Sequence, residues 1–341
     1  MKNHLLLILF FSCSINLSAQ FIKGKVSTEE GEALVGATVY IDGTTIGDAT
    51  NTEGEFSFEY KNNLNALMVI SFLGYKKAYI EQPRADTNYN IILKEDVSVM
   101  NEVVVFNNPF TREQMMKAFK EQFIGDKSLQ KKCVILNEED IRFKYNPRTL
   151  SFSATASKPL HIMNNYLGYE VNYDLVQFQS IYYSFTLNVN EIRSNTYSGT
   201  AQFIEKESNK KLLKRRNKAF ENSTISFFRA LKANKLKENG YQLYFKSFPV
   251  EPERFLSLEN ANQMTSVTVE QQERGFNPKN FVARLSILYN KKEQSAVSFY
   301  TNNFLIDTNG IHTNFNEILF SGTIANKKMA LMLPANYQPN P

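Results

Sequence analysis

The chain is 341 residues long, which is enough for two domains of ordinary size. Its hydrophobic content of 43% excludes wholesale disorder, and its 17 Tyr and 27 Phe favour β structure. The formal charge of +5 reflects 39 Lys and Arg against 34 Asp and Glu, an excess too small to mark a dedicated nucleic-acid-binding protein. We therefore expect a mainly β protein that does not bind nucleic acid.

Residues 1–20 have the pattern of a secretory signal peptide. Lys2 supplies a positive start, and the run LLLILFF supplies the apolar segment. Small residues then lead to Ala19 and Gln20, where we expect cleavage. The apolar run is shorter than the roughly 20 residues that a membrane-spanning helix needs. The pattern therefore predicts export, to the periplasm or in association with the outer membrane.

The two cysteines carry little functional information. Cys13 lies in the expected signal, and the residues before it match a lipoprotein signal poorly, so lipidation is a minor alternative. Cys133 lies in the apolar run CVIL. We expect a buried, inert thiol there.

From Phe21 to about Leu93, short alternating runs are separated by glycine-centred turns. The spacing of about 8–12 residues between turns is typical of a β-sandwich. Asp42-Gly43 supplies one such turn, since glycine accepts a positive φ. The run ALMVISFL, residues 66–73, predicts a central strand that is buried on both faces.

Four segments in this part of the chain belong together: GKVSTEEGEALVGATVYIDGTTIGDATNTEGEFSFEY, VISFLGYKK, NIILKED and NEVVV. Together they resemble the carboxypeptidase-regulatory-like domain, which heads many outer-membrane nutrient receptors of the starch-utilisation type. The resemblance covers residues 21–106 and implies a transthyretin-like β-sandwich. In the receptors, the segment that Glu102–Val105 resembles is a TonB box, followed by a plug and a large barrel. About 235 residues follow here, too few for both, so we expect EVVV to be a final strand or a linker.

Residues 107–126 predict a linker helix. Thr111 and Gln114 can form a capping box, and Gly125 suits the end of the helix. The helix carries an apolar stripe that we expect to dock onto the neighbouring domain: Met115, Met116, Phe119 and Phe123.

Residues 127–341 predict a larger β-rich α+β domain of unknown function with two helices near residues 210–239. We expect the second helix to span Thr224 to Asn239, and a strand pattern to repeat from Ile181 to Val189. Asn309-Gly310 predicts a type I′ hairpin. Three segments resemble exported proteins labelled as containing a carboxypeptidase-like regulatory domain, a likeness that implies no chemistry: NPFTREQ, PLHIMNNYLGYEVNYDL and LFSGTIANKKMALMLPANYQP.

The sequence offers no set of catalytic or metal-binding residues. Beyond the signal, the histidines are His161 and His312, and neither belongs to a His-x-x-Glu zinc motif. A nucleophile-elbow motif, a β-lactamase-type SxxK with its partner motifs and a glycine-rich phosphate loop are also absent. Glu170 and Asp174 fall on the solvent side of one strand, where exposed polar residues are a simpler reading than a glycosidase pair. We predict no catalytic residue, no metal and no cofactor.

A cluster of basic residues is the feature in this part of the chain that indicates a binding function. Six cations fall within nine residues: Lys210, Lys211, Lys214, Arg215, Arg216 and Lys218. We interpret them as a partner-binding patch for anionic lipopolysaccharide, an acidic glycan or an acidic protein. The alternative is a solvated helix face.

These observations predict a non-enzymatic, exported binding or docking protein of the cell envelope. The expected partner is a glycan or another envelope protein, with a peripheral outer-membrane contact. Two alternatives stay open. Residues 127–341 could form an outer-membrane β-barrel, and the family label alone suggests a carboxypeptidase-type hydrolase.

Overall fold

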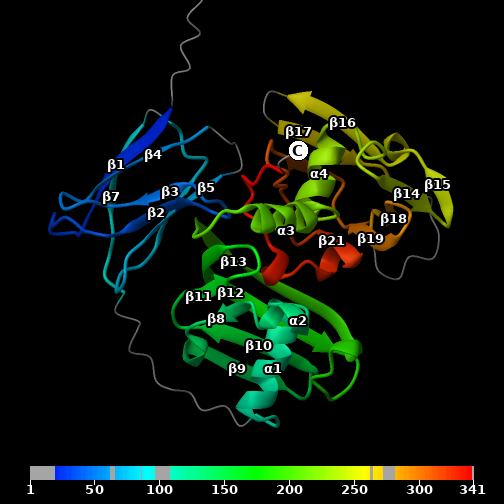
Figure 1. Ribbon diagram of the computed structural model, residues 1–341, viewed down its shortest axis with the longest axis horizontal. Coiled ribbons are helices and arrows are strands. Elements are labelled where there is room, and N and C mark those ends of the chain that lie inside the picture. Colours follow the sequence, from blue (N-terminus) through cyan, green and yellow to red (C-terminus); the bar gives the residue numbers. More distant parts are fainter. Residues whose placement is uncertain are drawn as a thin grey trace, which may run out of the picture.

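The computed structural model describes residues 20–61, 66–85, 87–96, 108–261, 264–271 and 281–339. Three hydrophobic clusters divide them into three units (Figure 1). We call these the sandwich (20–96), the middle unit (108–223 with 327–339) and the α4 unit (224–326). The protein is mainly β, with its described strands arranged in five sheets. Residues 1–19 and the EVVV segment lie outside the described residues.

The sandwich contains a three-stranded sheet of order β4-β1-β7 and a four-stranded sheet of order β3-β2-β5-β6. The strand bounds are β1 Phe21–Ser27, β2 Thr38–Ile41, β3 Gly47–Ala49, β4 Glu55–Glu59, β5 Leu67–Ser71, β6 Ala78–Glu81 and β7 Asn88–Ile92.

Alternation along the strands fills the core between these two sheets. Ile22 and Val26 on β1 point inward against Phe56 and Phe58 of β4. Gly24 lies between them, and a Cβ there would clash with the Tyr89 carbonyl oxygen of the paired strand β7 and come within 2.8 Å of the Phe56 ring. The close approach of the β7 backbone therefore requires glycine at this position.

The central strand β5 is buried on both faces, as its continuous apolar sequence predicts. Met68 and Ile70 belong to the sandwich core, whereas Val69 points the other way and is also buried. Val69 pairs with Tyr40 of β2, whose hydroxyl is 3.3 Å from the Thr200 hydroxyl in the middle unit. The second face of β5 is therefore turned toward the middle unit.

The middle unit is built on a six-stranded sheet of order β8-β11-β12-β10-β9, with β13 along the other side of β12. The bounds are α1 Arg112–Phe123, α2 Lys127–Gln130, β8 Cys133–Ile135, η2 Glu138–Asp140, β9 Ile141–Asn146, β10 Ser151–Ala156, β11 Leu160–Asn164, β12 Tyr169–Tyr182, η3 Val189–Glu191, β13 Ile192–Glu205 and α3 Lys210–Phe220. The prediction that the strand pattern continues to Val189 is wrong, because the chain leaves the sheet after Tyr182 and Phe185 is exposed.

Helix α1 begins with the predicted capping box, in which the Thr111 and Gln114 side chains each bond to the other's backbone N–H. Its apolar stripe packs on the sheet, where Phe119 lies against Phe143 and Phe178. Phe119 and Phe123 are fully buried in the middle core. The helix is therefore part of this unit, and the prediction of a linker is wrong.

The α4 unit contains the remaining strands. Its sheets have the orders β15-β14-β18-β19-β21 and β16-β17-β20. The bounds are α4 Thr224–Lys232, β14 Tyr241–Phe245, β15 Phe248–Val250, η4 Pro252–Arg254, β16 Leu256–Ala261, β17 Met264–Val269, β18 Ala283–Tyr289, β19 Glu293–Phe299, β20 Asn303–Ile306, β21 Ile318–Gly322 and η5 Thr323–Asn326; η6, Met329–Leu331, then lies in the tail.

Two local predictions fail in this unit. Helix α4 ends at Lys232 because Asn234 adopts a positive φ of 51°, which is incompatible with a continuing helix. The turn at Asn309-Gly310 is not type I′, since only Gly310 of the pair has a positive φ. Instead, the Asp307 carboxylate accepts hydrogen bonds from Asn309 N at 2.8 Å and Ile311 N at 2.9 Å.

Residues 127–341, predicted as one domain, supply two separate cores. The described strands after residue 127 belong to three different sheets and are not joined in one closed sheet. The first core is completed by the C-terminal tail, which returns to contribute Leu333 and Tyr337.

The tail also fastens the three units to one another. The Arg229 guanidinium of α4 donates to the carbonyl of Ala335 at 2.7 Å and to that of Tyr337 at 2.8 Å. The backbone N–H of Ala335 donates to Gly43 O of the sandwich at 2.7 Å. The short segment 333–338 therefore contacts all three units.

We expect Arg229→Ala to lower the free energy of unfolding by about 2–3 kcal/mol, because the partly buried carbonyls of Ala335 and Tyr337 lose charge-assisted hydrogen bonds. Arg229→Lys should recover little of the lost stability, since a single ammonium cannot replace the several N–H donors of the planar guanidinium. Urea denaturation measures both effects. Lys235→Ala is the control, because its ion pair with Glu238 is solvent-exposed. An unchanged midpoint for Arg229→Ala would show that the tail does not fasten the units.

Candidate partner-binding surface

Helix α3 presents a row of lysines to solvent. The Asn209 side chain caps the helix by accepting from Leu212 N at 3.0 Å. Leu212, Arg216 and Ala219 form the buried face. Lys210, Lys214 and Lys218 follow one another at four-residue intervals and are exposed, with Lys211 beside them.

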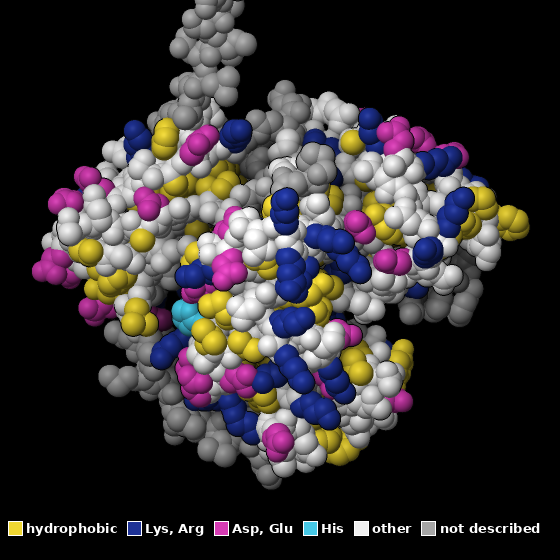
Figure 2. Space-filling model, viewed as in Figure 1, with side chains coloured by type: hydrophobic (Ala, Val, Ile, Leu, Met, Phe, Trp, Pro, Cys, Tyr) yellow, Lys and Arg dark blue, Asp and Glu magenta, His cyan; other side chains and the backbone are white. Residues whose placement is uncertain are grey.

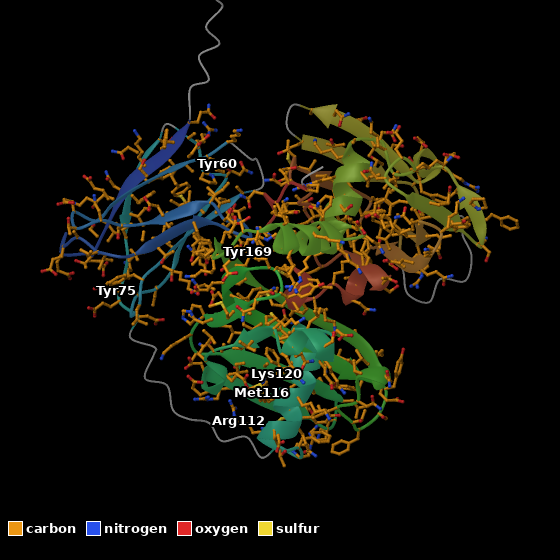
Figure 3. All side chains as sticks on the ribbon, viewed as in Figure 1. Tyr60, Tyr75, Arg112, Met116, Lys120 and Tyr169 are labelled. Atoms are coloured by element: carbon orange, nitrogen blue, oxygen red, sulfur yellow. The ribbon has the colours of Figure 1, made fainter. Side chains whose placement is uncertain are left out.

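Arg216 does not belong to this surface, contrary to the sequence prediction. It is 2% exposed, and its guanidinium lies 4.1 Å from the centre of the Tyr169 ring. Figure 3 labels Tyr169 beside α3. It donates to Leu167 O at 2.7 Å, to Glu207 O at 2.7 Å and to the Glu205 carboxylate at 2.6 Å. These contacts satisfy the buried charge, so Arg216 anchors α3 to the sheet.

Arg215 links α3 to a second group of lysines. Its Nη1 donates to Tyr166 O at 3.2 Å, and its guanidinium lies 4.8 Å from the centre of the Tyr166 ring. The Lys132 ammonium lies 5.7 Å from the centre of the same ring. Tyr166 therefore brings the segment after α2 close to α3.

Together these cations form one band on a single face of the molecule. Figure 2 shows the Lys and Arg side chains gathered from over α3 down to over α2. We define the basic band by its exposed lysines: Lys127, Lys131, Lys132, Lys210, Lys211, Lys214 and Lys218. Lys127 pairs with Glu121 at 3.2 Å. In the described part of the chain, no carboxylate lies within 4.0 Å of the other six.

The other residues singled out in the sequence lie apart from the band. His161 is exposed on β11, and His312 packs against the Phe228 ring at 4.3 Å in the α4 unit. Glu170 pairs with Lys206 at 3.2 Å, and Asp174 pairs with Lys77 at 2.5 Å. Both carboxylates therefore take part in ion pairs.

Cys133 is buried, as predicted. Its exposure is 2%, and burial raises the pKa of its thiol to about 12. The thiol is therefore protonated at neutral pH and is a poor nucleophile.

The sandwich joins the middle unit at the predicted Asp42-Gly43 turn. Gly43, with φ at +70°, donates its N–H to Ala201 O at 2.7 Å. The Asp42 carboxylate accepts from Ala201 N at 2.7 Å, and Thr44 O accepts from Phe203 N at 3.0 Å. The turn thereby adds a short parallel bridge to the free edge of β13.

Loss of water at this junction raises the pKa of Asp42 to about 6. Its N–H donors, Ala201 and Gly43, oppose the shift without cancelling it. The folded protein therefore binds a proton at Asp42 more readily than the unfolded chain does. Protonation of Asp42 therefore stabilises the folded protein at acid pH, and this stabilisation is lost as the pH rises through about 6.

We expect Asp42→Asn to remove this pH dependence, since the amide keeps an acceptor and carries no charge. As the pH falls from about 7.5 to about 4.5, the free energy of unfolding of the wild type should rise relative to that of the variant, by at most about 3 kcal/mol. Urea unfolding at the two pH values measures the gain. Glu59→Gln, at an exposed position on β4, is the control. The same pH response in Asp42→Asn and wild type would contradict the assignment.

Sequence reasoning missed Lys127, Lys131 and Lys132 as members of the band. They are about 80 residues from α3 in the chain and flank only a very short helix. Tyr166, which connects the two groups, carries no charge signal of its own.

The comparisons with known proteins concern the sandwich. Residues 22–105 match the family model of the CarboxypepD_reg-like domain. The TonB-dependent receptor SusC of Bacteroides thetaiotaomicron is 40% identical over 103 residues, which are 30% of this chain and 10% of the receptor. The TonB-dependent receptor P26 of Formosa agariphila is 34% identical over 93 residues, 27% of this chain and 9% of the receptor. The chain thus spans about a tenth of the length of these relatives, and the shared module fits a protein of the cell envelope.

Similarity to solved structures is low. A DUF3823 family protein from Bacteroides ovatus aligns over 85% of this chain and 99% of its own, with 9% identity and a TM-score of 0.18. A cohesin–X-dockerin complex from Acetivibrio cellulolyticus aligns over 30% of this chain and 72% of its own, with 15% identity and a TM-score of 0.20. Neither score supports an argument about fold or function.

Within the described residues, no helix combines the length and the apolar character that crossing a membrane requires.

Proposed function

We propose that this protein is a non-enzymatic, exported docking protein of the cell envelope, and that its basic band binds an acidic glycan. The match of the sandwich to a module of TonB-dependent receptors supports an envelope location. The observation that carries the binding role is the row Lys210, Lys214 and Lys218, near which the described residues place no carboxylate within 4.0 Å.

The row has an energetic cost that an external anion would remove. Like charges four residues apart on a helix destabilise it by about 0.2–0.5 kcal/mol per pair. Arg216 and Arg215 on the same helix are satisfied by carbonyls, a carboxylate and aromatic rings. The helix therefore compensates its inward charges, whereas its outward lysines form no ion pair with any residue that the structure describes. A polyanion lying along α3 and α2 would neutralise the band in one contact.

The sandwich supports this role by fixing the geometry of the surface. It is bonded to β13 through Gly43 and Thr44, and to the tail through Ala335. The Asn336 side chain adds a hydrogen bond to Thr45 at 2.9 Å. The module is therefore held against the body that carries the band, as a docking protein requires.

We expect the triple variant K210E/K214E/K218E to elute from heparin resin at a clearly lower salt concentration than the wild type. Heparin serves as the acidic glycan, and screening over about 10 Å at 0.1 M salt makes elution sensitive to surface charge. The variant should still fold, because all three positions are exposed to solvent and lie off the buried face of α3. Thermal unfolding checks that it does.

The matched control is K246E/K291E/K292E, which makes the same change of charge at exposed positions of the α4 unit. It should elute with the wild type or only slightly earlier. Equal shifts for the two triple variants would mean that net charge alone governs retention, and the proposal of a specific surface would fail. Capture by an acidic protein without retention on heparin would replace the glycan as partner.

A further inference from the structure

A pocket opens beside the lower part of the basic band, between α1, α2 and β8. Its volume is about 230 Å³. In Figure 3, Arg112, Met116 and Lys120 follow one another along α1, with Lys120 toward α2. Pockets that hold drug-sized ligands measure about 300–1,000 Å³, so an occupant here is smaller.

The lining of this pocket combines an apolar part with excess positive charge. Ile124, Val134 and Ile135 supply apolar surface, and Cys133 adds its protonated thiol. The charged lining residues are Lys120, Lys127, Lys131 and Glu138, three cations against one anion.

The three lysines differ in their partners. Lys120 is held by Glu138 at 2.5 Å. Lys127 reaches Glu121 at 3.2 Å with a side chain that is 72% exposed, so this pair is weak. Around Lys131, the described residues offer no carboxylate within 4.0 Å. Lys131 is therefore the cation at this pocket that is open to a ligand.

We propose that this pocket binds a small amphipathic organic anion, a carboxylate or phosphate ester on a short alkyl chain. The anionic group binds Lys131, with Lys127 beside it. The alkyl chain packs on Ile124 and Val134, so that its apolar surface is removed from water. The Lys120–Glu138 pair closes the adjoining wall and is not displaced.

This inference deepens the proposed function, since Lys127 and Lys131 also belong to the basic band. The band attracts polyanions without regard to their apolar parts, whereas the pocket selects an anion that carries one. An acidic glycan with an acyl or alkyl-phosphate substituent would use both.

The test is a titration of the full chain with hexanoate, followed by the NMR methyl signals of Ile124, Val134 and Ile135. Hexanoate should shift these signals saturably. Hexan-1-ol, which lacks the charge, and glucuronate, which lacks the alkyl chain, should each bind at least tenfold more weakly. Saturable binding of glucuronate or hexanol as tight as that of hexanoate would overturn the proposal, as would the absence of any shift with hexanoate.

Two variants connect the binding to this pocket. Lys131→Glu should weaken hexanoate binding at least tenfold, whereas Lys210→Glu, the same charge change on α3, should leave it unchanged. Val134→Phe fills the half-buried position in the lining and should also abolish binding. Thermal unfolding checks that each variant folds. If Val134→Phe does not fold, the result for Lys131→Glu decides the question alone.

The outcome is distinguishable from that of the proposed function. Val134→Phe leaves every lysine in place and should elute from heparin with the wild type. Retention on heparin without hexanoate binding would refute the pocket and leave the docking function standing. Hexanoate binding without selective heparin retention would support the pocket and refute the glycan as partner of the band.

Discussion

The arrangement of the three units depends on cations that are bonded to backbone carbonyls. Arg229 of α4 binds the carbonyls of Ala335 and Tyr337, and the tail that carries them also bonds to the sandwich at Gly43. Lys327 does the same at the end of α3, donating to Lys218 O at 3.2 Å and Ala219 O at 3.0 Å. Helix C-termini and turns leave carbonyls without backbone donors, and a long cationic side chain can satisfy several of them.

The same chemistry separates the basic residues into two classes. Arg215, Arg216 and Arg229 lie against carbonyls and aromatic rings, because the planar guanidinium has several donors in fixed directions and loses its water more readily than an ammonium. The exposed lysines of α3 stay in water and carry the net charge of the surface. Charge that fixes the fold and charge that is available to a partner thus alternate along one short helix.

Pairing at a strand edge explains how a module that also occurs in much longer receptors is built into this chain. The turn at Asp42–Thr44 pairs with the edge of β13, and the outer face of β2 and β5 covers the neighbouring surface. Main-chain bonding of this kind requires a tight turn and a free strand edge, and it depends little on side chains. The desolvated carboxylate of Asp42 is a consequence of this geometry.

Local patterns predicted the elements whose signals are short in range. The alternation of β1 and β4, the doubly buried β5 and the capping box of α1 follow from residues at most a few positions apart. Asn309-Gly310 shows the limit of such reasoning, since the Asp307 side chain supplies the turn's hydrogen bonds and a type I′ geometry is not needed. Helix α4 was predicted too long for a related reason, because the chain turns at Asn234 inside an apparently helical pattern.

The sequence by itself determined the mainly β character, the sandwich and the presence of a basic helix, because periodicity and turn residues act locally. Only the tertiary structure decided which cations are available. Composition cannot distinguish Arg216, which is enclosed by Tyr169 and Glu205, from its exposed neighbours, nor can it place Lys131 and Lys132 beside α3. The division of residues 127–341 into two cores, with the tail returning to the first, was likewise decided by contacts between residues far apart in the chain. Such contacts depend on which surfaces meet after folding, and no local pattern records them.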